Sequence, residues 1–411
     1  MSRFDEPQFE PLLEKLRTHL REERYGECAR FSYPYAARSF LRYLEHRGQS
    51  VEEVTSADVD RYLDSRRLKG SRRPYPKQFR RLHRAAIKML LRVTRDKWPP
   101  EVVPTTAHEI ADREIVDAYD AWMRELRGLS TRTRQRSCAE AYRLLSWMHE
   151  QGKTAPTLCI ADLDAYLAGR SPGQRRTSIA EITSKLRCVL RHLHRSGRMP
   201  VDLSGAITGP PIYALEGIPS AIRPEDVQRA LKALKQDRSP LGRRDYAIWM
   251  LLTTYGLRAG EIKALQLSDI DWRHERLRIR HTKTGACSEL PLLRAPAHAL
   301  LDYLQYGRPE TTARAVFLRA QAPHRELGIA TPLHGIVTRR LAAVGVVPTG
   351  RRGPHALRHA RAISLLRGGV PLKVIGDVLG HRSERSTAVY LKLATQDLRA
   401  VALDLPAGVA P

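Results

Sequence analysis

The first half of the chain contains an internal duplication, which constrains the fold more than any other feature of the sequence. Residues recur 104 positions later without a gap: Leu41, Tyr43, Gly48, Asp58, Asp60, Tyr62 and Leu63 correspond to Leu145, Trp147, Gly152, Asp162, Asp164, Tyr166 and Leu167. A long internal repeat indicates that one structural unit occurs twice. We therefore expect two similar domains ahead of the rest of the chain.

Each copy has the residue pattern of a helical domain. The expected elements are a stretch ending at Gly48 or Gly152, a short helix opened by Ser56 or Ala161, and a long basic helix over residues 80–93 or 178–195. Apolar residues at helical spacing predict the buried face of each long helix: Leu82, Ala85, Ala86 and Met89 in the first copy, and Leu186, Val189, Leu190 and Leu193 in the second.

The charge of the chain points to a polyanionic partner. Its 70 Lys and Arg residues outnumber 44 Asp and Glu residues, which gives a net charge of +26. Contacts with phosphates release condensed counterions, so we expect the partner to be double-stranded DNA. An Arg-rich proteome is the plainer explanation of the same charge.

The two long basic helices are the expected DNA contacts. Their cations lie beside the apolar face, where they can meet phosphates: Arg80, Arg81, Arg84, Lys88 and Arg92 in the first copy, and Lys185, Arg187, Arg191 and Arg195 in the second. For either helix alone, the alternative is a solvated charged face without a partner.

Two Pro-containing segments divide the chain. PPEVVPTTAH begins at residue 99, and ITGPPIYALEGIPSAIRP begins at residue 207. The expected organisation is a helical domain over 1–105, a second over 106–206, a linker over 207–222, a mixed α+β domain over 223–398 and a tail over 399–411. The fold class is therefore expected to be mainly α with a small β-sheet.

The sequence does not have the features of a membrane, secreted or metal-binding protein. It contains no run of about 18 apolar residues, and MSRFDEPQFEPLLEKL at its start is unlike a secretory signal. The five cysteines are dispersed, with no pair at metal-binding spacing: Cys28, Cys138, Cys159, Cys188 and Cys287. We expect a cytoplasmic, nucleoid-associated protein with no metal and no cofactor.

The third domain contains two basic residues in positions suited to chemistry. Arg258 follows Gly256 at the end of the apolar helix AIWMLLTTYG, and its guanidinium fork suits phosphate oxygens. Glu261 is three residues on and can orient Arg258. Two short strands, Leu277–His281 and Ser288–Leu292, are expected to flank a turn that holds Lys283. A lone turn lysine is ordinarily solvated.

The last helices contain further candidates. GPHALRHARAISLLRGGV predicts a helix from Pro354 to the glycines at 368 and 369, on which His355 and Arg358 share a face. His359 is expected to be packed or hydrogen-bonded and not catalytic. LGHRSERSTAVY predicts a helix stopped at Gly380, a loop with His381, and a helix opened by Ser386 or Thr387 that carries Tyr390 near its start.

Together these motifs resemble those of the tyrosine recombinase, or phage integrase, family. YGLRAGEI is similar to its first arginine box, TKTGACSELPL to its hairpin lysine, HALRHA to its His-x-x-Arg box, and LGHRSERSTAVY to its closing Gly-His and tyrosine. The resemblance covers about residues 222–398. The order of the motifs and the steps of 23 residues from Arg358 to His381 and nine to Tyr390 make the set specific.

The resemblance implies a role for each matched residue. Arg258 and Arg358 would bind the scissile phosphate, Lys283 and His355 would handle protons, His381 would contact the phosphate, and Tyr390 would attack it. The product would be a 3′-phosphotyrosine, which conserves the bond energy, so that no ATP or metal is needed. The family also implies a homo-oligomer, a tetramer on two DNA sites, serving integration, excision or transposition of a mobile element, alone or with partner recombinases.

Two other functions are compatible with the same residues. A type IB topoisomerase uses the same Arg, Lys, His and Tyr chemistry to relax supercoils, but the paired N-terminal modules favour recombination. A DNA-binding accessory protein with a silent active site is disfavoured, because all six catalytic positions hold competent residues. The extra N-terminal copy departs from the plain two-domain pattern, and we expect it to grip DNA outside the core site or to bridge to a neighbouring subunit.

Overall fold

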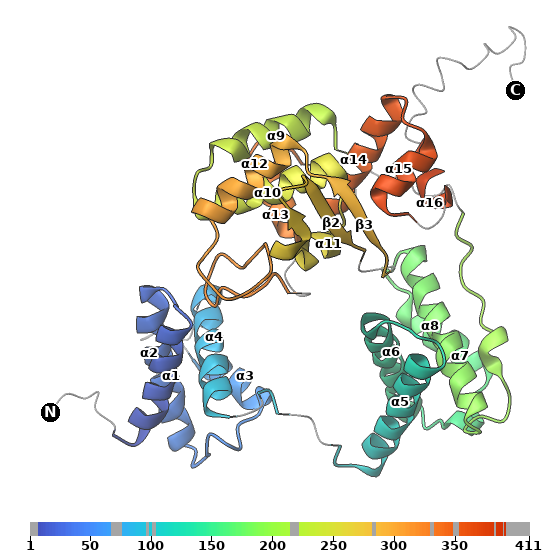
Figure 1. Cartoon of the computed structure of the whole chain (residues 1–411). Helices are drawn as coiled ribbons and strands as arrows, with labels where there is room; N and C mark the ends of the chain where they lie inside the picture. The colour runs from blue at the N-terminus through green and yellow to red at the C-terminus, as the bar shows by residue number, and fades with distance from the viewer. Residues whose placement is uncertain are drawn as a thin grey trace, which may run out of the picture. The chain divides into compact units, whose positions relative to one another are not determined.

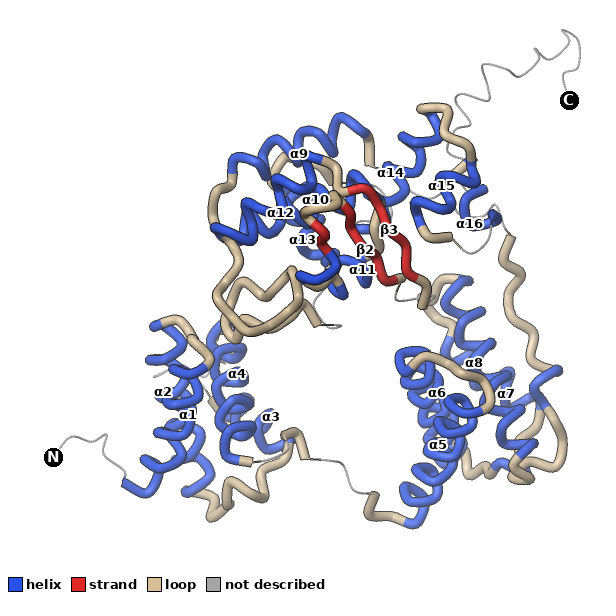
Figure 2. Tube along the Cα trace, in the orientation of Figure 1, coloured by secondary structure: helices blue, strands red, loops and turns tan. Residues whose placement is uncertain are grey.

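The computed structural model describes residues 7–66, 76–95, 98–100, 104–213, 222–281, 285–328, 333–347, 353–381, 384–388 and 390–391. The chain forms two compact units, one of Met1–Pro100 with Ile218–Pro411 and one of Glu101–Gly217. Helices dominate the described residues, and the three strands all lie in the C-terminal part (Figures 1 and 2). The expected fold class, mainly α with a small sheet, is confirmed at this level.

The N-terminal part of the first unit is a helical bundle, which we call the first bundle. After a 3-10 turn at Pro7–Phe9, its helices are α1 (Glu10–Glu22), α2 (Glu27–Glu45), α3 (Ser56–Ser65) and α4 (Lys77–Thr94). Helix α4 packs against the other three. The core is made by apolar stripes at helical spacing, such as Leu13, Leu16 and Leu20 on α1, all of them fully buried.

The second unit is also a helical bundle, which we call the second bundle. Its helices are α5 (Ala107–Glu125), α6 (Thr131–Glu150), α7 (Ile160–Arg170) and α8 (Arg176–Arg195), with 3-10 turns at Ala155–Thr157 and Leu203–Gly205. Leu186, Val189, Leu190 and Leu193 are all buried on α8, as their spacing predicts. Ile207 closes the same core.

Equivalent positions of the two bundles begin their third helix in the same way. Thr55 caps α3, and its backbone N–H donates to Asp58 Oδ2 at 2.9 Å. Cys159, 104 residues later, precedes α7, and its N–H donates to Asp162 Oδ2 at 3.0 Å. Each of these helices begins with the residue that follows this cap, so the second one starts at Ile160 and not at Ala161.

An aromatic pair is also equivalent in the two bundles. The rings of Tyr43 and Tyr62 meet edge to face with their centres 5.2 Å apart. Trp147 and Tyr166 meet in the same way at 5.5 Å. Edge-to-face contacts of this kind favour one relative placement of two helices. The pair therefore fixes how the third helix packs against the second in each bundle.

The expected buried face of α4 is wrong by one position. Ala85 is exposed, and Leu82 and Met89 are only partly buried. The buried residues of α4 are His83, Ala86, Ile87, Leu90 and Leu91. Ala86, Ile87 and Leu90 correspond to Val189, Leu190 and Leu193 at an offset of 103, so the repeat loses one residue before its last helix. The segment before the last helix is one residue shorter in the second copy, so the offset of 104 does not hold beyond it.

The C-terminal part of the first unit surrounds a central helix. Its helices are α9 (Pro224–Gln236), α10 (Pro240–Tyr255), α11 (Ala259–Ala264), α12 (Arg294–Tyr306), α13 (Leu333–Ala342), α14 (Pro354–Arg367), α15 (Leu372–Leu379) and α16 (Glu384–Ala388), with a 3-10 turn at Leu267–Asp269. Helix α10 packs against α9, α12 and α14 (Figure 1). Ile248, Trp249, Leu251 and Leu252 of α10 are fully buried in the core.

A three-stranded antiparallel sheet lies beside this core. Its strands are β1 (Ile270–Asp271), β2 (Arg276–Arg280) and β3 (Cys287–Pro291), in that order. The two strands expected from the sequence are present, shifted by one residue toward the N-terminus, with Leu277 opposite Leu290. The two-residue strand β1 was not expected, because it is too short to show alternation. Helix α11 lies against β2.

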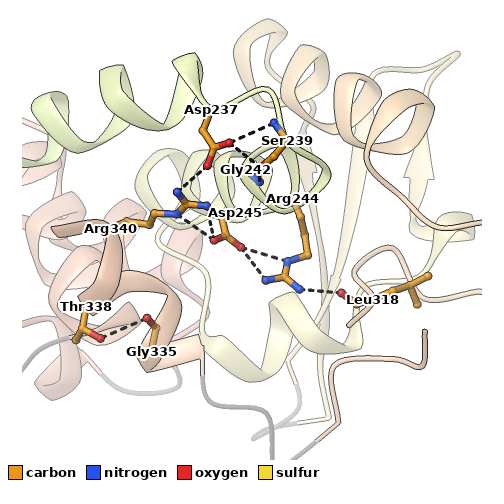
Figure 3. A network of polar contacts seen from close by, with 9 residues as sticks. All are labelled: Asp237, Ser239, Gly242, Arg244, Asp245, Leu318, Gly335, Thr338 and Arg340. Atoms are coloured by element: carbon orange, nitrogen blue, oxygen red, sulfur yellow. Dashed lines mark hydrogen bonds and ion pairs between the residues drawn. The ribbon is translucent and has the colours of Figure 1, made fainter. Parts of the chain in front are cut away.

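A buried polar network ties the helices around α10 together (Figure 3). Asp245, which is 1% exposed, accepts from Arg244 Nη2 at 2.8 Å and from Arg340 Nη2 at 3.0 Å. Arg340 of α13 also donates to Asp237 Oδ2 at 2.8 Å, beyond the end of α9. Arg244 donates to the carbonyl oxygen of Leu318 at 3.1 Å. The network connects α9, α10, α13 and the loop at Leu318 through the carboxylate of Asp245. Removing one member would leave the others buried without a partner, so the network stabilises the fold only when it is complete.

Candidate active site

Arg258 is held by its neighbours at the start of α11. It follows Gly256, whose left-handed backbone (φ 66°) ends α10. Its Nη1 donates to Glu261 Oε1 at 2.7 Å, and its Nη2 donates to the carbonyl oxygen of Gly380 at 2.9 Å. The side chain is 19% exposed, so the guanidinium is oriented but still accessible. The contact with Glu261 is the one that the spacing predicts.

Arg358 is buried beside Arg258. The residue is 3% exposed, and its Nη1 donates to the carbonyl oxygen of Gly256 at 2.7 Å. Its Nη2 donates to the carbonyl oxygen of Leu379. Burial, followed by the positive charge of Arg258, lowers the pKa of Arg358 from 12.5 to about 10. The two guanidiniums are thus held close together by the consecutive carbonyls of residues 379 and 380, a geometry that favours an anion between them.

A buried histidine that the sequence analysis did not single out supports this arrangement. His281 follows β2 and is 4% exposed; its Nδ1 lies 2.7 Å from Glu261 Oε1, and its Nε2 lies 2.8 Å from Ser288 Oγ. Gly380 has φ 61°, and a Cβ there would overlap the His281 ring. Position 380 therefore requires glycine for two reasons: its left-handed backbone conformation, and the lack of space for a Cβ beside the His281 ring.

Glu261 is the carboxylate on which these contacts converge. It is 2% exposed. Burial alone would raise its pKa, but hydrogen bonds from His281 and from Arg258 prevail and lower the pKa of Glu261 below its ordinary value. Glu261 therefore stays ionised and orients Arg258. The alternation Leu277, Ile279, His281 places His281 on the inward face of β2, and this signal could have identified it from the sequence.

Tyr390 lies in a small apolar cluster next to the two arginines. It is 2% exposed and packs with Ala362, Ile375 and Leu379. Burial raises the pKa of Tyr390 above 10, whereas Arg358 and Arg258 act in the opposite direction. Its hydroxyl oxygen lies 3.3 Å from Nδ1 of His359. His359 is thus hydrogen-bonded, as expected, but to the candidate nucleophile itself.

The expected position of Tyr390 near the start of a helix is wrong. Helix α16 covers Glu384–Ala388, and Tyr390 follows its end, with its N–H donating to the carbonyl oxygen of Thr387 at 2.9 Å. Ser386 and Thr387 are inside the helix and do not open it. Five residues are too few for a helical period to be recognised in the sequence.

His381 lies between the arginines and the tyrosine. It follows Gly380, its ring is stacked on that of Tyr390 with centres 6.1 Å apart, and its Nδ1 lies 2.8 Å from Thr387 Oγ1. Burial, followed by the charges of Arg358 and Arg258, lowers the pKa of His381 to about 4. The imidazole is therefore neutral near pH 7 and contributes a hydrogen bond, not a charge.

The remaining candidates are placed differently. Lys283 lies outside the described residues, which resume at Gly285 after His281. His355 is exposed on α14 while Arg358 is buried, so the two do not have the same surroundings. The ring of His355 has its centre 6.4 Å from that of His359. The structure therefore brings Arg258, Arg358, His381 and Tyr390 together and leaves His355 at the edge of the group.

The basic residues of α4 divide into two classes. Arg80 and Arg84 form ion pairs with Asp64 and Asp60 of α3. The other three are exposed: Arg81, Lys88 and Arg92. The exposed cations fit a DNA contact better than the paired ones.

The basic residues of α8 differ in the same way. Lys185 is paired with Glu181 at 2.8 Å, and Arg187 donates to the carbonyl oxygen of Ile207 at 2.6 Å. Arg191 is partly buried and Arg195 is exposed. Arg187 is thus part of the local packing. Nothing in the sequence distinguishes it from its neighbours, because its partner is a backbone carbonyl 20 residues away.

Two kinds of feature are absent from the part of the chain that the structure describes. None of the helices there is long and apolar enough to cross a membrane. No group of three or more His, Cys, Asp or Glu side chains there is arranged to hold a metal ion.

The sequence and the fold are similar to those of known recombinases. Residues 220–397 match the phage integrase family. A putative integrase/recombinase of Sinorhizobium fredii, y4rA, is 33% identical over 93% of this chain and 91% of its own. Tyrosine recombinase XerC of Mycobacterium bovis is 30% identical over 70% of this chain and 96% of its own.

A solved structure shares the fold. It is a lambda integrase tetramer bound to a Holliday junction, with a TM-score of 0.52, 16% identity, and coverage of 78% of this chain and 89% of that one. Because the relationship to y4rA extends over nearly the whole sequence, this chain belongs to the phage integrase family, the tyrosine recombinases.

Proposed function

We propose that this protein is a site-specific recombinase that cleaves and rejoins DNA through a 3′-phosphotyrosine at Tyr390. The observation that carries the proposal is the pair of guanidiniums, Arg258 and Arg358, held on the carbonyls of residues 379 and 380 beside the Tyr390 ring. Two adjacent cations are stable together when an anion lies between them, and a phosphodiester has that charge.

The proposed reaction is a transesterification. The Tyr390 oxygen forms a bond to phosphorus while the bond from phosphorus to the 5′ oxygen breaks; the phenol loses its proton and the departing 5′ oxygen gains one. Arg258 and Arg358 stabilise the charge on the non-bridging oxygens. Lys283 and His355 are the proposed proton-handling residues. Rejoining reverses the step with another strand, without ATP or a metal.

Three histidine side chains and one glutamate side chain have proposed supporting roles. Glu261 and His281 orient Arg258, through a buried carboxylate with two partners. His381, neutral because of its low pKa, donates to the phosphate from Nε2. His359 holds the phenol through its hydrogen bond to the Tyr390 hydroxyl. Burial keeps that phenol protonated until a phosphate reaches the arginines.

The two helical bundles are proposed to be related DNA-binding modules. Support comes from the equivalent caps at Thr55 and Cys159 and from the equivalent ring pairs of Tyr62 and Tyr166. The second bundle would face the catalytic domain across double-stranded DNA. The first would grip DNA outside the core site or bridge to a neighbouring subunit. The proposed division remains 1–105, 106–206, 207–222 and 223–398.

We expect the active form to be a homo-oligomer, a tetramer on two DNA sites, acting on a mobile element, alone or with partner recombinases. The lambda integrase structure with the same fold is a tetramer on a Holliday junction. Exposed basic side chains on α4 and α8 would contact phosphates. Over the whole chain, similarity to an integrase/recombinase favours recombination over topoisomerase or silent accessory functions.

Covalent trapping tests the chemistry. The full-length protein would be incubated with a library of nicked duplexes carrying randomised sequences, and SDS-resistant protein–DNA adducts would be isolated. We expect an adduct whose phosphorylated peptide contains Tyr390, and we expect Tyr390→Phe to abolish it.

Tyr306→Phe is the matched control, because Tyr306 is 66% exposed on α12 and lies outside the site. It should form the adduct at the wild-type rate. An adduct that survives in Tyr390→Phe, or no adduct with any duplex in the wild type, would contradict the proposed function.

A further inference from the structure

The first bundle has a basic groove along α2. Its volume is about 660 Å³, and we call it the α2 groove. Six arginines line it: Arg17, Arg30, Arg38, Arg42, Arg47 and Arg66. No carboxylate is among its described lining residues. The DNA contacts expected for this bundle lie on α4, and none of those residues lines this groove.

The groove follows one face of a single helix. Phe31, Tyr35, Arg38, Arg42 and His46 are spaced by four, three, four and four residues, so they form one stripe on α2. The fifteen residue steps from Phe31 to His46 extend for about 22 Å. A DNA strand with the stacked geometry of a duplex advances about 3.4 Å per nucleotide, so the stripe is as long as about six stacked nucleotides.

Two aromatic rings are unusually accessible in this groove. Phe31 is 82% exposed and Tyr35 is 63% exposed, one helical turn apart. A single exposed apolar residue needs no explanation, but two neighbouring rings flanked by guanidiniums present flat faces beside positive charge. Every nucleobase has a π-face that stacks on such a ring, and the adjoining phosphate is attracted by the arginines.

Carboxylates from α1 pair with two of the six arginines. Glu10 is paired with Arg17 and lies 3.0 Å from Arg38, and Glu14 lies 3.0 Å from Arg17. These ion pairs lie on the α1 side of the groove, whereas Arg42 and Arg47 lie toward the C-terminal end of α2.

The second bundle does not repeat the stripe. At the offset of 104, which the equivalent caps and ring pairs support, the same positions on α6 hold Gln135, Ala139, Tyr142, Ser146 and Glu150. The framework of the bundle therefore does not require arginines at these positions. One exposed ring, Tyr142 (41% exposed), stands on this face of α6 at the position of Arg38, but the arginines and the two neighbouring rings occur only at the positions of the first bundle.

We infer that the α2 groove binds single-stranded DNA, with phosphates on the arginines and unpaired bases stacked on Phe31 and Tyr35. A duplex offers the same phosphates but keeps its base faces stacked on one another, so the two rings would gain little from it. The inference rests on the proposed function for the origin of the unpaired strand, because strand cleavage and exchange release one. The groove would hold such a strand near the complex.

Fluorescence anisotropy of the full-length protein tests this. The probes are a labelled single strand of about 20 thymidines and a duplex of the same length. We expect Arg42→Gln combined with Arg47→Gln to weaken single-strand binding by about tenfold or more. Phe31→Ala combined with Tyr35→Ala should weaken single-strand binding by a similar factor and leave duplex binding within about twofold.

The matched control is Lys15→Gln combined with Arg21→Gln. These residues are exposed on α1 outside the groove, and the variant removes the same charge from the same bundle. It should bind the single strand within about twofold of the wild type. Urea unfolding midpoints would show that all three variants are folded.

Three outcomes would overturn the inference. The first is an unchanged single-strand affinity in both groove variants. The second is an equal loss of duplex and single-strand binding in the aromatic variant, which would assign the groove to duplex DNA. The third is that the groove variants lose binding to labelled polyglutamate but keep their single-strand binding, which would assign the groove to an acidic protein. Adduct formation at Tyr390 is read separately, so failure of the proposed chemistry is distinguishable from failure of the groove.

Discussion

The two helical bundles share a framework but differ in the hydrogen-bond partner that they provide for one buried tyrosine hydroxyl. In the second bundle, the Tyr166 hydroxyl donates to Glu140 Oε1 at 2.8 Å, and Glu140 is 1% exposed. In the first bundle, Ala36 stands at the position of Glu140. There the Tyr62 hydroxyl lies 3.1 Å from Ser39 Oγ and 3.2 Å from His83 Nδ1.

This difference separates what the fold needs from what it tolerates. The caps, the ring pair and the apolar stripes occur in both bundles and define the packing. The polar partner of the tyrosine is needed in each, because a buried hydroxyl without a partner is destabilising, but a carboxylate or a serine–histidine pair can supply it. Exposed residues have diverged freely, as α2 and α6 show.

The largest expected effect on stability comes from removing the buried carboxylate of the second bundle, Glu140. Glu140→Ala installs the residue of the first bundle and removes the partner of Tyr166 and of Arg170, whose Nη2 lies 3.4 Å from Glu140. We expect the free energy of unfolding of the second bundle to fall by about 3 kcal/mol or more. Urea unfolding, with hydrogen exchange of α6 and α7 peptides, measures it.

A rescue experiment sharpens this prediction. Arg143 corresponds to Ser39, so Arg143→Ser added to Glu140→Ala offers Tyr166 a hydroxyl partner like that of Tyr62 and should recover about 1 kcal/mol. Glu181→Ala is the control, because Glu181 is exposed on α8. If the control lost as much stability as Glu140→Ala, burial of Glu140 would not be the cause.

Lowering the pH is expected to have an effect of intermediate size on the stability of the first bundle, through His83. Burial, followed by the charge of Arg66, lowers the pKa of His83 from 6.5 to about 4. Between these values the unfolded chain binds more protons than the folded one, so the free energy of unfolding of the first bundle should fall as the pH is lowered from about 6.5 to about 4. The loss is at most about 3 kcal/mol.

Urea titrations at several pH values, with hydrogen exchange of α4 peptides corrected for intrinsic rates, measure this dependence. His83→Gln should flatten it in α4. Burial also lowers the pKa of His192 in the second bundle, so α8 should keep its own dependence in that variant. A pH dependence of α4 that is the same with and without His83 would contradict the assignment.

The smallest effect is expected on the surfaces. Tyr142→Arg combined with Ser146→Arg installs on α6 the residues found at Arg38 and Arg42. Both positions on α6 are exposed. The free energy of unfolding should change by no more than about 0.5 kcal/mol, as measured by urea titration. A larger loss would mean that the exposed faces contribute to the framework.

Much of the fold could be predicted because strong local signals end the elements. Gly256 and Gly380, in left-handed conformation, end α10 and α15 where the sequence indicates. Alternation identifies β2 and β3 to within one residue. The buried face of α4 was wrong because the repeat changes by one residue between the third and fourth helices. The gap is hidden because apolar residues of α4 match apolar residues of α8 at an offset of 104 as well as at 103.

The site was predictable in its residue types but not in its geometry. Spacing suggested the contact of Arg258 with Glu261, because both lie within one helical turn. The contacts from Arg258 and Arg358 to the carbonyls of Gly380 and Leu379 span more than 20 residues and involve backbone atoms, which carry no side-chain signal. His359 was expected to be packed or hydrogen-bonded, and only the fold shows that its partner is Tyr390.

The two carbonyls at the end of α15 have a mechanical consequence. They belong to adjacent residues, so Arg258 and Arg358 are tethered to one short piece of backbone. Each arginine also has a second anchor, Glu261 for Arg258 and the carbonyl of Gly256 for Arg358. A shift of the backbone at the end of α15 would therefore act on both guanidiniums together, while their second anchors stay in place.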